Sequence, residues 1–415
     1  MTGKEKVLRA LNHQPGKVPI DFGSNAVTGM HVSIVAALRD QYGLEKKPVK
    51  VIEPYQMLGE VDDELKEVIG IDVEGLLAPL SNWGFPLTDW KQWATPWGQE
   101  VLVPGMFTTK TEAGHLYIYP QGDTSAEPSG HMPEGGYFFD TIIRQNHFDE
   151  DNLKAEDNLE EFMPFTEMDL KYYMGHKEQV KNSSRAVVGS FPGTALGDIA
   201  LVPGPGMKDP WGIRDVTEWY MSMALRQDLL HEIFDRQTEI ALGNLQTYKN
   251  ILGNTVEVVF TCGTDFGTQD SQFCSTSTFD ELYLPYYRKI NDWIHTNTSW
   301  KTFKHSCGAV EGFISHFIEA GFDIINPVQC SAAGMDPKTL KERYGKDIVF
   351  WGGGVDTQHT LPFGTPEEVR KEVLERLEIF SKDGGFVFDA IHNVQAKTPI
   401  ENVVTMLKAV QEFNA

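Results

Sequence analysis

The chain has few cysteines and no long apolar stretch. Only four of its 415 residues are cysteine, too few for a disulfide framework, so we expect a reducing, cytoplasmic location. The first segment, MTGKEKVLRALNHQPGKVP, is charged and amphipathic and lacks the apolar core of a signal peptide. No apolar run approaches the length that spans a bilayer. We therefore expect neither secretion nor membrane insertion.

Positive charge is also in deficit. Lys and Arg number 36 against 59 Asp and Glu, which gives a formal net charge of −23. Such a chain repels phosphate backbones and anionic membrane surfaces, so nucleic acid is not an expected partner. A free polyanionic substrate is disfavoured for the same reason. Hydrophobic residues make up 41% of the sequence, enough to fill a large globular core.

A repeated pattern runs from about residue 300 to the end. A short β-prone run, a polar tip and an amphipathic helix follow one another four times, and this alternation predicts a parallel sheet with right-handed crossovers. Thr365, followed by Pro366 and two glutamates, is a typical helix start. The four β-prone runs are TFKHSCG, FDIINPVQC, DIVFWGGGVDTQ and GGFVFDAIHN.

Earlier β-prone runs bring the expected strands to eight. They are KVPIDF (17–22), VEGLLAPL (73–80), RAVVGSF (185–191) and TVEVVFTCG (255–263), and a long helical stretch covers 216–250. Eight strands favour a (β/α)₈ TIM barrel over an open, doubly wound α/β sheet. We expect one barrel domain over residues 1–415.

The region from about 83 to 150 has a different composition, rich in Trp, Gly and Pro. Its runs WGQEVLVP and TEAGHLYIYP predict a β-hairpin, so we interpret the region as a β-rich subdomain inserted into the N-terminal half of the barrel. Within it, Tyr137 and Phe138 are candidates for a substrate-binding wall or lid. The alternative is a surface excursion that packs on itself.

Chemistry-bearing side chains follow the later strands, at the ends where the βα loops of a barrel converge. Cys262 and Cys274 are interpreted as structural. The candidates, in chain order, are Asp265 and Gln269, His305 and Cys307, Cys330, Asp356 and Gln358, and His392.

The His305-Ser306-Cys307 sequence predicts a metal site. Imidazole and thiolate are ligands that zinc prefers, and catalytic zinc uses three protein ligands. On a strand, residues two apart point to the same face, which in a barrel is the central cavity. Gly308 then allows a tight turn over the site.

The third ligand and the acids have alternative interpretations. Cys330 offers a second thiolate and is slightly preferred as the third ligand, whereas His392 is either that ligand or a catalytic acid/base. Asp265 and Asp356 are each a metal ligand, a catalytic base or a helix cap. Gln269 and Gln358 are candidates for substrate binding.

Several segments resemble the uroporphyrinogen decarboxylase (URO-D) superfamily, and within it the cobalamin-linked zinc methyltransferases. They are KEKVLRALNHQPGKVPIDF, TFDELYLPYYRKI, KHSCGAVEGFISHFIEAGFDIINP, GTPEEV and TPIENV, which together reach both ends of the chain. The resemblance implies a TIM-type barrel and a catalytic zinc bound through H-x-C and a later cysteine. His305 and Cys307 match the H-x-C, but His392 occupies the later cysteine's place.

The decarboxylase branch carries an arginine-rich motif after the first strand. Here that place reads DFGSNAVTGMHV, without arginine, so a polycarboxylate would find no clamp. The resemblance therefore favours methyl transfer between a small methylated compound, such as an O-methyl ether, or a thiol, and the cobalt of a corrinoid. Because no D-x-H-x-x-G motif is present, we expect a partner protein to carry the corrinoid.

Two rival hypotheses remain open. One is a cofactor-independent decarboxylase of the same fold, in which Asp265 acts and the His/Cys cluster is incidental. The other is a non-catalytic protein that binds a small ligand or a corrinoid. A homodimer is the candidate assembly.

Overall fold

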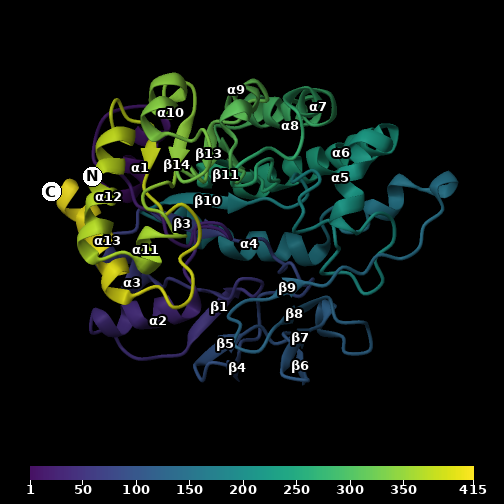
Figure 1. Cartoon of the computed structure of the whole chain (residues 1–415), viewed down its shortest axis with the longest axis horizontal. Helices are drawn as coiled ribbons and strands as arrows, with labels where there is room; N and C mark the ends of the chain where they lie inside the picture. Colours follow the sequence, from purple (N-terminus) through teal and green to yellow (C-terminus); the bar gives the residue numbers. More distant parts are fainter.

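A parallel sheet of seven strands forms the centre of the molecule (Figure 1). The computed structural model describes residues 1–415. Neighbouring strands are hydrogen-bonded in the order β15-β14-β13-β12-β11-β10-β3, and every pair is parallel. The predicted parallel α/β sheet is confirmed. Its strands are β3 (Val73–Leu76), β10 (Ala186–Ser190), β11 (Val258–Cys262), β12 (Lys301–His305), β13 (Ile324–Asn326), β14 (Val349–Trp351) and β15 (Phe386–Val387).

Residues 17–22 lie between the two edge strands of this sheet. Ile20 forms a parallel bridge with Phe388, which directly follows β15. Its carbonyl accepts a 2.9 Å hydrogen bond from the amide of Asp72, which directly precedes β3. The sheet thus curls into a TIM-barrel-like arrangement, with a single bridge where the sequence predicts a longer first strand.

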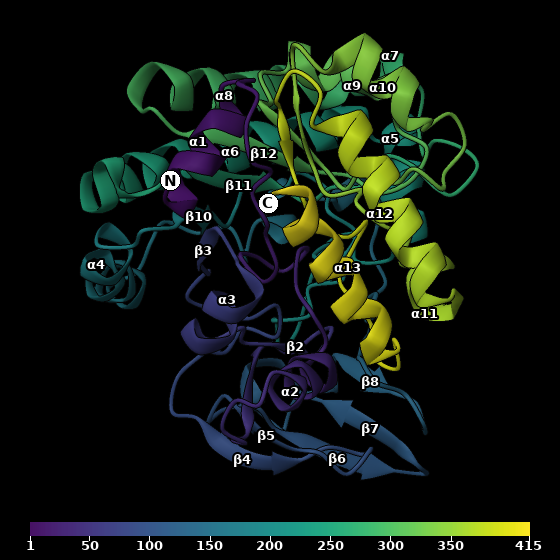
Figure 2. The same cartoon turned by 90° about the vertical axis from the view of Figure 1, so that its left-hand side faces the viewer.

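Helices connect the barrel strands (Figure 2). Thr365 caps α12 as predicted, because its side chain accepts from the Glu368 amide and the Glu368 carboxylate accepts in return. The predicted helical stretch from 216 to 250 is divided at Arg226. The helices are α1 (Gly3–Leu11), α2 (Val32–Gln41), α3 (Asp63–Ile69), α4 (Glu167–Lys181), α5 (Val216–Leu225), α6 (Gln227–Leu252), α7 (Thr276–Leu282), α8 (Leu284–Asn297), α9 (Glu311–Glu319), α10 (Pro337–Tyr344), α11 (Thr360–Phe363), α12 (Pro366–Phe380) and α13 (Ile400–Phe413).

The barrel interior is apolar at one end and polar at the other. Phe303, Ile324 and Val349 belong to one buried cluster with Val7 and other residues of α1, which closes the end where the strands begin. Side chains two positions further along a strand point the same way. The next inward positions on β12 and β13 are therefore His305 and Asn326, so the carboxyl ends of the strands carry the polar groups.

Two small sheets lie apart from the barrel sheet in both views (Figures 1 and 2). One has the order β2-β1-β5-β4 and the other β6-β7-β8-β9. Their strands are β1 (Val49–Glu53), β2 (Leu58–Gly59), β4 (Lys91–Ala94), β5 (Glu100–Val103), β6 (Thr109–Glu112), β7 (His115–Ile118), β8 (Gly130–Met132) and β9 (Asp140–Thr141).

The prediction that WGQEVLVP and TEAGHLYIYP pair with each other is wrong. The first run contains β5, which pairs with β4. The second contains the end of β6 and all of β7, which pair with each other. Positive φ angles at Gly98, Ala113 and Gly114 mark the two turns. Short-range turns therefore override the longer pairing.

The small sheets share a hydrophobic core with the rest of the chain. Trp83, Phe85 and Val101 belong to the same buried cluster as Phe313 and Leu407, which lie on helices around the barrel. Two strands of these sheets, β1 and β2, also precede residue 83, where the predicted subdomain begins. No helix of the structure is both long enough and apolar enough to cross a membrane.

Candidate metal centre

Three of the predicted residues converge at the carboxyl ends of the strands. His305 is the last residue of β12, Cys307 follows it, and His392 lies on the loop after β15. One potential ligand atom from each of the three side chains lies within 4.8 Å of the other two. The two imidazole rings are 5.4 Å apart between centroids. The cluster thus joins two strands that are not neighbours in the sheet.

Asn326 fixes the orientation of His305. The Asn326 amide group donates to the Trp351 carbonyl, at 2.9 Å, which leaves its Oδ1 to accept from His305 Nδ1 at 2.6 Å. The proton on Nδ1 leaves Nε2 with a free lone pair, 3.4 Å from Cys307 Sγ. Burial lowers the pKa of His305 to about 4, although the Asn326 contact opposes it. His305 is therefore neutral at pH 7, as a metal ligand must be.

Cys307 is held by Asp265 from the neighbouring strand end. Its backbone amide donates to Asp265 Oδ1 at 2.7 Å, and the same oxygen lies 3.9 Å from His305 Nε2. Burial and then the Asp265 charge raise the pKa of the Cys307 thiol well above its ordinary value. Gly308 adopts φ 88°, and an added Cβ would lie 2.5 Å from Gly267 backbone atoms. The predicted requirement for glycine at 308 is confirmed.

His392 completes the group. Burial lowers its pKa to about 4, and neighbouring His305 lowers it further, so this imidazole is also neutral at pH 7. The side chain is only partly exposed. Of the two candidates for a third ligand, the structure brings His392 to the pair formed by His305 and Cys307.

Cys330 lies elsewhere. It lines a separate open cavity together with Met335, Lys338 and Arg376, and burial raises the pKa of its thiol to about 12. The adjacent Gln329 turns the other way, since its Oε1 accepts from the Gly308 amide at 2.8 Å. The preference for Cys330 is therefore revised, because the loop after β13 directs this side chain away from the cluster.

Asp356 caps its own loop. Its Oδ1 accepts from the amides of Gln358 and His359, at 2.6 and 3.2 Å. Gln358 is exposed. Gln269 instead links two loops, because its amide donates to the Ser331 carbonyl at 2.6 Å and its carbonyl accepts from Gln329. Of these residues, none joins the cluster.

Tyr137 packs against the loop that carries His392. Its ring stacks on Trp97 with centroids 5.0 Å apart, and Lys397 Nζ lies 4.6 Å from its centroid. The neighbouring Phe138 is 43% exposed. The N-terminal sheets therefore contact the rim of the site through Tyr137.

Sequence reasoning missed three residues around the ligands. Asn326 orients His305, Ser306 Oγ accepts from the Phe266 amide at 2.9 Å, and Lys304 is fully buried behind the site. Asn326 pairs in register with His305, so aligning the polar ends of neighbouring predicted strands would have identified it. Ser306 and Lys304 carry no comparable signal.

The three residues fit a zinc ion. Their donors are two imidazole nitrogens and one sulfur, the ligand types that zinc prefers, and three protein ligands are typical of catalytic sites. The hydrogen bond from Nδ1 of His305 to Asn326 is the second contact that metal-binding histidines usually make.

Comparison with known proteins finds relatives of the C-terminal half. Residues 212–413, which contain the whole cluster, match the family model described as uroporphyrinogen decarboxylase (URO-D). A uroporphyrinogen decarboxylase from Psychromonas ingrahamii is 24% identical over 265 residues, 63% of this chain and 69% of that protein. One from Coxiella burnetii is 33% identical over 89 residues, 20% of this chain and 24% of that protein.

A solved structure has the same fold. It is described as a methyltransferase from Methanosarcina mazei, and it aligns over 100% of both chains with a TM-score of 0.57 and 17% sequence identity. Residues 212–413 are thus similar in sequence to the URO-D superfamily, and the whole chain shares the fold of a methyltransferase.

Proposed function

We propose that this protein is a zinc-dependent methyltransferase that moves a methyl group between a small methylated compound, or a thiol, and the cobalt of a corrinoid. The single observation that carries the proposal is the convergence of His305, Cys307 and His392 at the carboxyl ends of the barrel strands. The similarity to the URO-D superfamily and the methyltransferase fold support it.

Each of these side chains has a definite task. His305 and His392 are neutral at pH 7 and present nitrogen lone pairs, and Cys307 supplies the thiolate. Bound zinc supplies Lewis-acid chemistry, which makes an alkoxide or phenolate a tolerable leaving group or makes a thiol acidic enough to ionise at neutral pH. Holding three donors in advance of substrate avoids reorganisation during the reaction.

Asp265 is the proposed proton-handling group. Its Oδ1 is engaged by the Cys307 amide, so Oδ2 remains to accept or donate a proton. The side chain is 25% exposed, which allows contact with a substrate in the barrel mouth. Burial raises the pKa of Asp265, because the desolvated carboxylate is less stable than the neutral acid.

The methyl carrier is proposed to be a corrinoid on a separate protein, because this chain has no D-x-H-x-x-G motif. Tyr137 and its stacking partner Trp97 form an aromatic surface that Lys397, on the loop that carries His392, contacts. An aryl methyl ether would match that surface.

A cofactor-independent decarboxylase is the second candidate, favoured by the names of the sequence relatives. It predicts activity without metal. The segment DFGSNAVTGMHV argues against it, since it offers no arginine to a polycarboxylate.

Metal analysis is the first test. We expect about one zinc per purified chain, and almost none in the H305A/C307A variant. C330A is the matched control, because it removes a cysteine outside the cluster and should retain zinc. A wild-type protein that carries no zinc after purification with supplied metal would refute the proposal.

Methyl donors are then screened with cob(I)alamin, and methylation is followed by its absorbance. Methyl ethers and a thiol with methylcobalamin test both directions of transfer. Methyl transfer that survives complete zinc removal would contradict the role proposed for zinc, whereas decarboxylation without metal and without methyl transfer would favour the decarboxylase alternative.

A further inference from the structure

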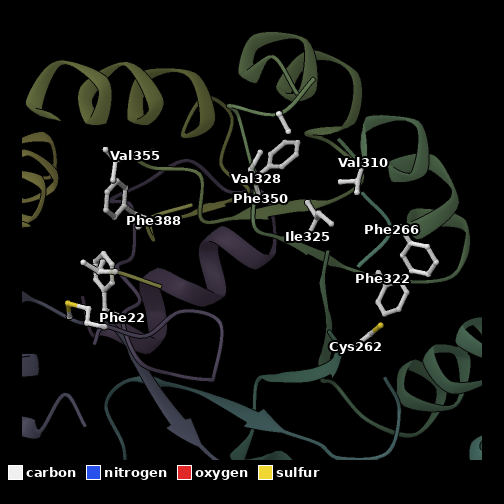
Figure 3. Close-up of a cluster of buried hydrophobic side chains, with 14 of the residues drawn as sticks. Phe22, Cys262, Phe266, Val310, Phe322, Ile325, Val328, Phe350, Val355 and Phe388 are labelled. Atoms are coloured by element: carbon white, nitrogen blue, oxygen red, sulfur yellow. The ribbon is translucent and has the colours of Figure 1, made fainter. Parts of the chain in front are cut away.

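Lys304 is a fully buried lysine directly before His305. Its relative exposure is 0%, and it points outward from β12 because His305 points into the barrel. The layer that surrounds it is apolar, and Figure 3 shows Cys262, Phe266 and Phe322 close to one another in this layer. A charged group in such surroundings has a high desolvation cost unless other groups compensate it.

All three N–H donors of a lysine ammonium find acceptors here. Lys304 Nζ donates to the His305 carbonyl at 2.7 Å, to the Thr264 carbonyl at 2.5 Å, and to Cys262 Sγ at 3.2 Å. An ammonium has three donors and no acceptor, so this geometry fits the charged form. No carboxylate forms an ion pair with it.

Aromatic rings surround the same nitrogen. Nζ lies 5.0 Å from the Phe266 ring centroid, 5.3 Å from Phe317 and 5.9 Å from Tyr287. Rings within about 6 Å attract a cation through their quadrupoles, most strongly away from water. These contacts offset part of the desolvation cost but leave the positive charge without a direct counter-ion.

The acceptors of Lys304 connect it to the metal cluster. Thr264 immediately precedes Asp265, and His305 is itself a proposed ligand. Asp265 Oδ1 in turn accepts from the Cys307 amide. Hydrogen bonds and chain connectivity thus link the segment after β11, with Thr264 and Asp265, to the end of β12, with Lys304, His305 and Cys307.

We propose that Lys304 is a positioning residue for the metal centre, which fixes the His305 and Thr264 carbonyls and thereby holds His305 and Asp265 in place at the ends of their strands. This inference rests on the proposed function, because it needs the metal site to exist. Partners behind metal ligands typically alter metal affinity by about 10- to 100-fold, and we expect Lys304 to lie in that range.

Three variants test the inference through zinc affinity, measured by competition with a chromophoric chelator. K304M keeps the length of the side chain and removes its charge and donors, and we expect a loss of about 10- to 100-fold. K304R keeps a buried cation and should restore most of the affinity. K341M is the matched control, because Lys341 is also partly buried, donates to the Gly384 carbonyl and lies near the Phe350 ring, but contacts no residue of the cluster.

Cobalt substitution adds a readout that loss of stability alone would not change. The thiolate-to-cobalt absorption band reports the Cys307 bond, and we expect it to shift in K304M and to stay at the wild-type position in K341M. Equal zinc affinity and equal spectra in K304M and wild type would overturn the inference. Absence of zinc binding in wild type would instead refute the proposed function.

If K304M does not fold, wild-type protein decides the question. The side-chain ammonium signal of Lys304, assigned by its loss in K304R, should move in the ¹⁵N spectrum when zinc is added to ¹⁵N-lysine-labelled protein. The Lys341 signal should not move. A Lys304 signal unaffected by saturating zinc would contradict the inference.

Discussion

The loops after β11 and β14 begin with similar sequences and serve different purposes. GTDFGTQ (263–269) and GVDTQ (354–358) each place an Asp and then a Gln after a buried strand. Asp265 accepts from the amide of Cys307 on the next strand end, whereas Asp356 accepts from two amides of its own loop. The same sequence pattern therefore yields a site residue in one loop and a loop cap in the other.

The difference arises from what the neighbouring strand presents. Beyond β12 lies the Cys307 amide, which faces Asp265 and has no other partner in its own loop. Asp356 instead has free amides within reach, and an Asp at a loop start satisfies these first. The local sequence thus places an Asp that can accept hydrogen bonds, but which backbone amide donates to it depends on the tertiary structure.

The largest expected effect is the loss of zinc affinity when the proposed third ligand is removed. H392A should lower zinc affinity by more than about 100-fold, beyond the range typical of residues that only orient ligands. C330A should leave it unchanged, because Cys330 lines another cavity. Chelator competition measures both. The reverse result would restore Cys330 as the ligand and would show that its loop moves on metal binding.

The paired acids give the next largest effect. D265A should lower zinc affinity and methyl-transfer rate by about 10- to 100-fold, because the side chain that holds the Cys307 amide is lost. D356A should leave both unchanged and reduce the free energy of unfolding by about 1 kcal/mol, as expected for a lost cap. Equal losses of zinc affinity in the two variants would remove the distinction between the loops.

A third acid at a strand end, Asp21, predicts a pH effect. It is completely buried, and burial raises its pKa to about 6 despite hydrogen bonds from Ser24 and Trp351. The folded state therefore binds more protons than the unfolded state between about pH 4 and pH 6, so the stability should be highest at the acidic end of this window and fall as pH rises through 6. The loss should total about 3 kcal/mol, because the pKa rises from 3.8 to about 6 and each pKa unit corresponds to about 1.4 kcal/mol.

D21N should flatten that dependence. Urea unfolding in the presence of a chelator at about pH 4.5 and about pH 7.5 compares the two proteins inside and above the window given by the shift. A wild-type slope identical to that of D21N would assign the pH dependence to other groups.

The smallest effect concerns the glutamines of the two loops. Q269A should cost about 1 kcal/mol, since its amide bonds to Ser331 and Gln329 are lost. Q358A should change stability by less than about 0.5 kcal/mol, because the side chain is exposed. Thermal unfolding measures both. A larger loss of stability in Q358A would indicate that the Gln358 side chain makes a stabilising contact within the protein itself.

Strand positions were predictable because most residues of the barrel strands β10 to β15 are buried and form short β-prone runs. The segments around His305, Cys262 and Val349 all form strands where the sequence predicts them. The pairing of the N-terminal strands was not predictable, because several β-prone runs compete there and the turns at Gly98 and Gly114 select local partners.

The sequence alone determined that His305 and Cys307 share a face, because alternation along a strand is a property of the backbone at adjacent residues. It also determined the tight turn at Gly308. Only the tertiary structure brings His392, and not Cys330, close to this pair, since the path of a loop depends on packing against distant segments. Curling of the sheet brings the loop after β15 to the mouth beside β12, while the loop after β13, adjacent in the sheet, turns its cysteine outward. The burial of Lys304 behind the ligands was likewise decided by the helices that cover β12.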